Sequence, residues 1–216
     1  MQSELAVRRE PEWQPPSGAY AVGGCFVCFA RGALAPGARG EPGWAGAAVA
    51  IERRIVARAL VSGRAGAAYR PGLLALREGP LLEAAVRALP RAPEVLLVNA
   101  SGRDHPRRAG LALQLGAVIG VPTVGVTHRP LLASGAWPAQ ERGARSPLLL
   151  DGELVGCWLR TQARARPLAV HPGWRTGLDG ACAIVLAASA RARAPEPLRE
   201  ARRLARRGRA GVEDRA

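Results

Sequence analysis

Residues 94–126, EVLLVNASGRDHPRRAGLALQLGAVIGVPTVGV, carry the pattern that decides the fold class of this 216-residue chain. Glu94–Val98 is a short apolar run typical of a central strand, and Thr123–Val126 is a second such run. Pro106–Ile119 lies between them and is predicted to form a helix. A strand, a helix and another strand in succession favour an α/β fold.

The segments on either side of residues 94–126 predict further strands and helices. Apolar runs bounded by turn residues predict strands at 20–29, 45–51, 55–61, 148–150 and 154–159. The last two flank Asp151-Gly152, a signal for a tight hairpin turn. Apolar residues at helical spacing predict helices at 73–89 and 175–190, the first interrupted at Pro80. We therefore expect a mixed central sheet flanked by helices.

The length and composition suit one globular domain with a flanking segment at each end. The chain has 48% hydrophobic and 22% charged residues, which is typical of a folded domain. We expect residues 1–18 to be a flexible leader, 19–198 the domain, and 199–216 a partly disordered basic tail. No apolar run approaches the ~18 to 20 residues of a membrane span, and the polar first residues do not resemble a signal peptide. The expectation is a cytoplasmic monomer that does not enter a membrane.

The charge of the chain indicates a polyanionic partner. The formal net charge is +14, and every basic residue is arginine. Arginine without lysine, beside abundant Ala, Gly and Pro, is the composition that a GC-rich genome produces, and it carries no function. Such a codon bias does not by itself remove acidic residues, so the net positive sign still favours contact with nucleic-acid phosphates.

The four cysteines are predicted to be buried structural thiols. Cys25 and Cys28 have the spacing of a redox pair or of half a zinc site. In a strand, however, their side chains would point to opposite faces. Cys157 and Cys182 lie far apart in the sequence with no neighbouring ligand, so a zinc site is not completed. Free cysteines are usually buried, which favours the structural interpretation.

Several short motifs follow one another along residues 20–198. In chain order they are Tyr69-Arg70-Pro71-Gly72; Leu76-Arg77-Glu78-Gly79-Pro80; His105-Pro106-Arg107-Arg108; GVPTVGV at 120–126; Ala163-Arg164 with Pro167-Leu168; Gly173-Trp174-Arg175 with Asp179; and Pro195-Glu196-Pro197. Each motif alone is weak. Together, in this order, they resemble the endonuclease V family, whose fold is ribonuclease H-like.

The resemblance implies a repair nuclease that uses Mg²⁺ or Mn²⁺ and finds inosine in DNA or RNA. The family's reaction cuts the second phosphodiester on the 3′ side of the deaminated base. Clustered acids at strand ends would hold the cation, which activates water. A wedge would open the duplex so that the base can be extruded and read. The nucleic-acid contacts that the resemblance assigns are Tyr69, Pro71, Gly72, His105, Arg107 and Arg108.

The sequence departs from the family at its metal-binding and catalytic positions. Phe26 follows Gly23-Gly24-Cys25 where the family has an aspartate. Asn99 replaces the family's second aspartate, in Val98-Asn99-Ala100-Ser101-Gly102. His128 replaces a lysine and Trp174 a histidine. Phenylalanine cannot ligate Mg²⁺, and Asn99 supplies one neutral oxygen in place of a charged one.

Glu78 is the retained acid of the family's metal set, and with Asn99 it forms the remaining candidate metal ligands. We expect that these two would bind a cation weakly or not at all, so that cleavage is impaired or lost. In the alternative interpretation, these residues have no role in function: Glu78 is a solvated acid on a helix, Tyr69 is an ordinary loop aromatic, and His105 caps a helix. Arg107 and Arg108 are then solvated charges rather than phosphate contacts.

Three hypotheses remain open from the sequence. The first is a non-catalytic nucleic-acid-binding protein, to which the arginine stripe Arg202, Arg203, Arg206 and Arg207 contributes unless it is a solvated tail. The second is an active endonuclease V-type enzyme in which Glu78 and Asn99 hold Mg²⁺ or Mn²⁺ with a third acid, Asp104 or Asp179. The third is a gene product with no selected role.

Overall fold

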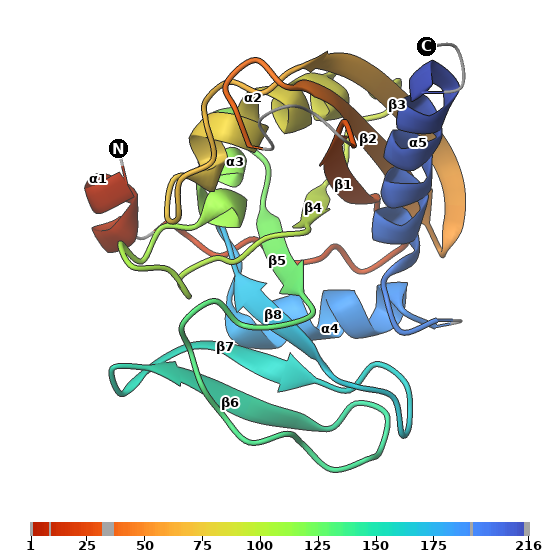
Figure 1. Cartoon of the computed structure of the whole chain (residues 1–216). Coiled ribbons are helices and arrows are strands. Elements are labelled where there is room, and N and C mark those ends of the chain that lie inside the picture. Colours follow the sequence, from red (N-terminus) through yellow and green to blue (C-terminus); the bar gives the residue numbers. More distant parts are fainter. Residues whose placement is uncertain (1, 9, 32–36, 191, 214–216) are drawn as a thin grey trace.

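The centre of the molecule is one mixed sheet, seen in a computed structural model that describes residues 2–8, 10–31, 37–190 and 192–213. In this part of the chain eight strands follow the order β3-β2-β1-β4-β5-β8-β7-β6 (Figure 1). Their bounds are β1 Val22–Phe29, β2 Pro42–Ile51, β3 Arg54–Arg64, β4 Val95–Val98, β5 Thr123–Thr127, β6 Arg145–Leu150, β7 Glu153–Leu159 and β8 Leu168–Pro172. The predicted loop between β1 and β2 lies partly outside the described residues, at 32–36.

The parallel part of the sheet consists of β1, β4 and β5. β4 pairs in parallel with β1 on one side and with β5 on the other, whereas the remaining strand pairs are antiparallel. Because Cys25 pairs with Val98, the next residues of both strands, Phe26 and Asn99, lie at the same edge. Val98 pairs in turn with Gly125 of β5, so the residues at the carboxyl end of β5 lie at the same edge of the sheet. The carboxyl ends of parallel strands are a common place for a binding site.

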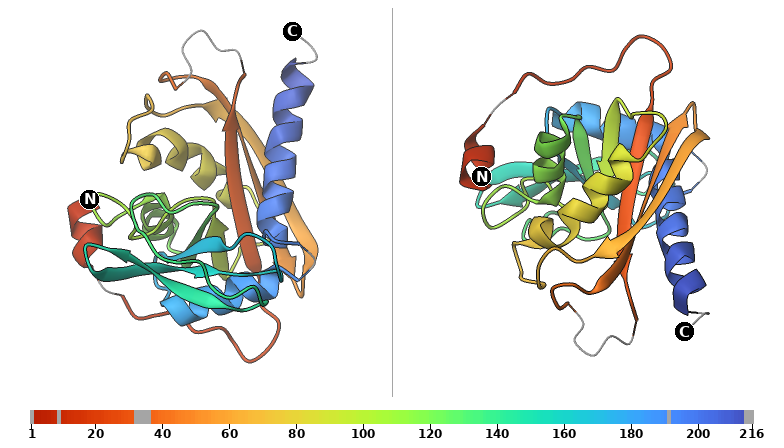
Figure 2. Two further views of the ribbon diagram at one scale, coloured as in Figure 1. Left: turned by 60° about the horizontal axis from the view of Figure 1, so that its bottom comes forward. Right: turned by 90° about the horizontal axis from the view of Figure 1, so that it is seen from above.

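Helices cover both faces of the sheet, as the mixed α/β prediction requires. The helices are α1 Gln2–Val7, α2 Leu74–Arg87, α3 Leu111–Ile119, α4 Leu178–Ala188 and α5 Glu196–Glu213. Successive residues of β4 serve the two faces in turn: Leu96 and Val98 belong to the cluster of α2 and α3, and Leu97 to that of α4 and Leu198. Figure 2 shows α5 on one side of β1–β3 and α2 on the other. Among the described residues no helix is long and apolar enough to cross a membrane.

Helix α5 lies against bare backbone of the sheet. A side chain at Gly24 of β1 would lie 2.5 Å from the backbone nitrogen of Leu198, and one at Gly46 of β2 would overlap the carbonyl oxygen of Ala201. Ala201 and Ala205 are fully buried at this contact. The basic tail that we predicted from residue 199 is therefore, up to residue 213, part of a helix that packs on the domain.

Two further predictions at the ends of elements were wrong. Helix α3 begins at Leu111 and not at Pro106, because Arg108 has a left-handed backbone conformation with φ of 53° that interrupts a helix. Helix α4 begins at Leu178 and not at Arg175, which also has a positive φ of 53°. Strand β8 was not predicted. Within the leader, α1 was not predicted either, and its Leu5 is buried with Leu113 and other residues.

The prediction of buried thiols is confirmed for three of the four cysteines. Cys25, Cys157 and Cys182 are buried, whereas Cys28 is half-buried. Cys157 of β7 and Cys182 of α4 are far apart in the sequence, but their Sγ atoms lie 2.8 Å apart as free thiols. The fold brings them together because α4 packs across β7 and β8.

Candidate nucleic-acid interface

Three of the four substituted family positions meet at the carboxyl ends of the parallel strands. Phe26, Asn99 and His128 line one small cavity of about 40 Å³, called the Phe26 cavity below. The strand pairing explains the meeting, since Phe26 follows the last residue of β1 that pairs with β4, and Asn99 and His128 follow the last residues of β4 and β5. Trp174 is not among the described residues that line this cavity. It is buried near α1, with the Arg8 guanidinium 5.0 Å from its ring.

A cationic side chain of α5 covers the Phe26 ring. The guanidinium carbon of Arg202 lies 4.9 Å from the ring centroid, within the range of a cation–π contact. Burial lowers the pKa of Arg202, and the charge of Arg206 lowers it further. Arginine remains charged in proteins even so. A permanent cation therefore lies on the aromatic ring of Phe26.

His128 lies in the same electrostatic environment as Arg202. Burial lowers the pKa of His128, and the charges of Arg193 and Arg202 act in the same direction. The histidine is therefore biased towards its neutral form near physiological pH. It therefore does not supply the fixed positive charge that a lysine would.

Glu78 lies on the other face of the sheet from the Arg202 contact. It belongs to α2, which packs on the Cys25 side of β1, and it is not among the described residues lining the Phe26 cavity. Burial raises the pKa of Glu78 to about 7, against the opposing charge of Arg77. No described residue hydrogen-bonds to its carboxylate. A cation that bound Glu78 at neutral pH would therefore first have to displace this proton from part of the molecules.

Neither of the other acids considered as ligands is available to replace the lost aspartates. Asp104 is fully buried, and its carboxylate accepts backbone N–H bonds of 2.5 to 2.8 Å from residues 131–133. Asp179 has a side chain 93% exposed and pairs with Arg145 at 2.7 Å. Among the described residues no group of three or more His, Cys, Asp or Glu could hold a metal ion. The residues present therefore do not fit the cation that the family resemblance implies.

The predicted wedge residues line a second, larger cavity. Tyr69, Pro71, Gly72 and His105 border a volume of about 350 Å³, called the Tyr69 cavity below. The Tyr69 side chain is 58% exposed, and Gly72 has a φ of +75° that favours glycine. Asn99 lines both cavities, so the Tyr69 cavity opens beside the Phe26 cavity.

His105 holds the wedge loop in place. Its Nε2 lies 3.1 Å from the carbonyl oxygen of Gly72, and its Nδ1 accepts the backbone N–H of Arg107 at 3.1 Å. These partners fit a neutral imidazole that donates from Nε2. Burial lowers the pKa of His105, which favours the same neutral form. The residue is thus more than a helix cap, since it joins the loop before α3 to the loop before α2.

The two arginines of the central motif are engaged by other side chains of the protein. Arg107 donates to the Oε1 of Gln2 at 3.1 Å. Arg108 forms ion pairs with Asp151 at 3.0 Å and Glu153 at 3.4 Å, at the turn between β6 and β7. Neither is among the described residues lining that cavity. Arg108 in particular is already neutralised by two carboxylates.

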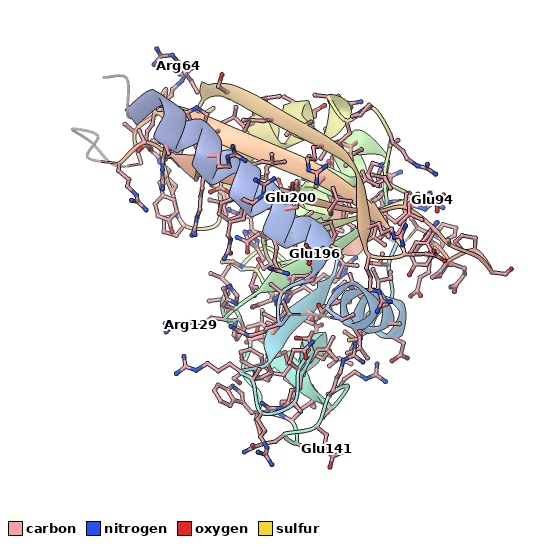
Figure 3. All side chains as sticks on the ribbon, turned by 90° about the vertical axis from the view of Figure 1, so that its right-hand side faces the viewer. Arg64, Glu94, Arg129, Glu141, Glu196 and Glu200 are labelled. Carbon is pink, nitrogen blue, oxygen red and sulfur yellow. The ribbon has the colours of Figure 1, made fainter. Side chains whose placement is uncertain are left out.

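A third hollow follows α5 and is lined by arginines. Its volume is about 650 Å³, and we call it the arginine groove; its arginines are Arg193, Arg199, Arg202, Arg203, Arg206 and Arg207. It shares Arg199 and Arg202 with the Phe26 cavity. Figure 3 shows this face, with Glu196 near the start of α5, Glu200 further along it and Arg129 beyond the helix. The arginine stripe predicted from the sequence begins at Arg202 and does not include Arg193 and Arg199. The spacing of Arg199, Arg202 and Arg206, which is that of one helix face, could have indicated Arg199.

Comparisons with known proteins agree with the motifs. A family model for endonuclease V matches residues 9–203. The endonuclease V of Geotalea uraniireducens is 45% identical over 150 residues, a match that spans 69% of this chain but 64% of the Geotalea protein. The crystal structure of Streptomyces avermitilis endonuclease V is 38% identical with a TM-score of 0.87, and covers 100% of this chain and 92% of that one.

A more distant structure shares the fold. The endonuclease V of Ciona intestinalis is 21% identical with a TM-score of 0.78, over 98% of this chain and 95% of that chain. Together with the mixed eight-stranded sheet of the described residues, these similarities confirm the predicted ribonuclease H-like α/β fold. The model match and the relatives show that this chain belongs to the endonuclease V family.

Proposed function

We propose that this chain binds nucleic acid with a preference for inosine and no longer cleaves it. The observation that carries the proposal is the Arg202 guanidinium on the ring of Phe26. Metal-dependent hydrolysis needs clustered negative oxygens that hold the cation. Here the first position is apolar, the second is neutral, and a permanent cation occupies the neighbouring space, which repels a divalent ion.

Binding is supported by features separate from the metal site. The Tyr69 cavity combines an exposed aromatic side chain with a volume of about 350 Å³, large enough for an extruded base. The net charge of +14 attracts phosphates. The Ciona endonuclease V, which shares the fold, was crystallised with DNA containing an inosine.

The test compares an end-labelled oligonucleotide containing one inosine with the same strand containing adenosine. We expect the unmodified protein to bind the inosine strand more tightly in EDTA, and to yield no cleaved strand with Mg²⁺ or Mn²⁺. Tyr69→Ala should remove the preference, because the aromatic contact with the opened base is lost. Trp137→Ala is the matched control, since Trp137 is 57% exposed and is not among the described residues lining the cavity.

Cleavage is expected only after the metal ligands are restored. A Phe26→Asp, Asn99→Asp variant would place a carboxylate under Arg202, so Arg202→Ala is added to keep that carboxylate available for the cation. Metal-dependent cutting by this triple variant supports the account. Robust cutting by the unmodified protein, abolished by Glu78→Ala, contradicts it and favours an active enzyme with non-standard ligands.

A further inference from the structure

The arginine groove has an excess of unpaired positive charge. Its acidic neighbours are already engaged: Glu196 pairs with Arg199 at 2.7 Å, and Glu200 pairs with Arg58 and Arg203 at 2.5 and 2.6 Å. Hydrogen bonds from Arg203 and Arg58 hold the pKa of Glu200 down at about 2, so it remains an anion committed to those partners. Within the described part of the chain no carboxylate lies within 4 Å of the remaining guanidinium groups of the groove, those of Arg193, Arg202, Arg206 and Arg207.

The structure also holds two of these cations, Arg193 and Arg202, in place. Arg193 donates to the carbonyl oxygens of Arg166 and Pro167 at 2.7 and 3.1 Å. Arg202 is held on the Phe26 ring. Like charges that are held near one another are unfavourable in free energy, and a bound anion relieves the repulsion. Burial lowers the pKa of both residues, and a neighbouring arginine lowers it further: Arg166 for Arg193 and Arg206 for Arg202.

The Phe26 cavity shares lining residues with both the arginine groove and the Tyr69 cavity, so it lies between them. The Phe26 cavity shares Arg199 and Arg202 with the groove, and it shares Asn99 and Thr127 with the Tyr69 cavity. Arg129, which lines the Tyr69 cavity, follows directly on His128 of the Phe26 cavity. A chain with a charge at each repeat could therefore pass from the Tyr69 cavity over Phe26 and along α5. Guanidinium groups match phosphate oxygens in geometry as well as in charge.

We propose that the arginine groove binds the phosphate backbone of a nucleic-acid strand, with Arg202 holding a phosphate beside Phe26 where the family would use a divalent cation. The inference rests on the proposed function, because the strand in the groove is the one whose base would enter the Tyr69 cavity. Binding through the groove is independent of metal, and Mg²⁺ weakens it by competing for the phosphates.

The experiment measures affinity by fluorescence anisotropy in EDTA, with the inosine strand and the adenosine strand as probes, across a range of salt concentrations. Arg202→Ala is expected to weaken binding of both strands about tenfold and to reduce the slope of log affinity against log salt by about one. Arg206→Ala, at an exposed position of the same groove, is expected to act in the same direction. This second variant keeps the test valid if loss of the Phe26 contact unfolds the protein.

Arg91→Ala is the matched control, because it removes one equal charge from an exposed site before β4, at the opposite end of that strand from Asn99. If Arg202→Ala and Arg206→Ala bind like Arg91→Ala while the inosine preference persists, the groove proposal is wrong and the proposed function stands. If the two strands bind with equal affinity and both affinities depend on the groove arginines, the groove proposal is supported and the proposed inosine preference is wrong. Absence of binding, or binding that requires Mg²⁺, overturns the groove.

Discussion

The side chains of Phe26 and Arg202 depend on each other, because they form a cation–π contact. Without the ring, Arg202 would lose a cation–π partner worth about 0.5 to 2 kcal/mol. With an aspartate at position 26, the same guanidinium would form an ion pair and neutralise a metal ligand. The substitution at position 26 and the position of Arg202 are therefore coupled, and neither can be interpreted alone. The same coupling is the reason why the cleavage test in the triple variant removes Arg202.

Glu78 gives a prediction about stability and pH. Its folded pKa of about 7 lies above the usual 4.5, so the folded state keeps a proton that the unfolded state releases. The resulting penalty is absent below pH 4.5, grows between pH 4.5 and 7, and is complete above pH 7. Glu78→Gln should therefore stabilise the fold at pH 8 by up to about 3 kcal/mol and leave it unchanged at pH 4, as measured by urea denaturation.

The control for this prediction is Glu83→Gln on the same helix. Glu83 is paired with Arg87 at 2.8 Å near the surface, so its replacement should cost a few tenths of a kcal/mol, about 0.3, at pH 8 and should not stabilise the fold there. An equal stability change for Glu78→Gln at pH 4 and pH 8 would show that Glu78 is not held with a raised pKa.

The position of α5 depends on the glycines beneath it. Gly46→Ala would direct a methyl group at the carbonyl oxygen of Ala201, which the helix can avoid only by moving away. We expect this variant to lose about 1 to 3 kcal/mol of stability, as overpacked cores do, and also to bind nucleic acid more weakly because Arg202 is displaced. Thermal unfolding and anisotropy on the same samples measure the two effects.

Gly211→Ala is the control at the level of the helix. Gly211 lies on α5 itself and has no heavy atom within 4 Å of an added side chain, so alanine should stabilise the helix by up to about 1 kcal/mol. Unchanged stability and affinity in Gly46→Ala would contradict the close packing of α5 on the sheet.

Some elements could be predicted from the sequence and others could not. The hairpins and the central strands have alternating or continuous apolar runs that need no distant information, and they were found where predicted. Helix α5 was missed although Leu198, Ala201 and Ala205 recur at helical spacing among the arginines; two of these three are alanines that lie close to glycines of the sheet, so the apolar stripe has few bulky side chains. The starts of α3 and α4 were predicted too early because Arg108 and Arg175 adopt left-handed backbone conformations. Arginine has no preference for this conformation, so the sequence does not indicate it.

At the scale of the whole molecule, motif order predicted the family and the fold, and the substituted positions predicted the altered site. What the sequence could not supply is the contact between residues 26 and 202, which lie near opposite ends of the chain. The adjacency of the three hollows is also a property of the folded chain, since the fold brings Phe26 of β1 and the loops after β3, β4 and β5 close to α5. A basic composition indicated an anionic partner, and the fold indicates a path for it.

Calorimetric titration with Mn²⁺ is the most direct measurement of the central claim, that the substituted site no longer holds a catalytic cation. The unmodified protein is compared with the triple variant Phe26→Asp, Asn99→Asp, Arg202→Ala under identical conditions. We predict no saturable heat for the unmodified protein and saturable binding for the triple variant, because two charged oxygens are restored and a competing cation is removed. Saturable, stoichiometric Mn²⁺ binding by the unmodified protein that Glu78→Gln abolishes would contradict the account.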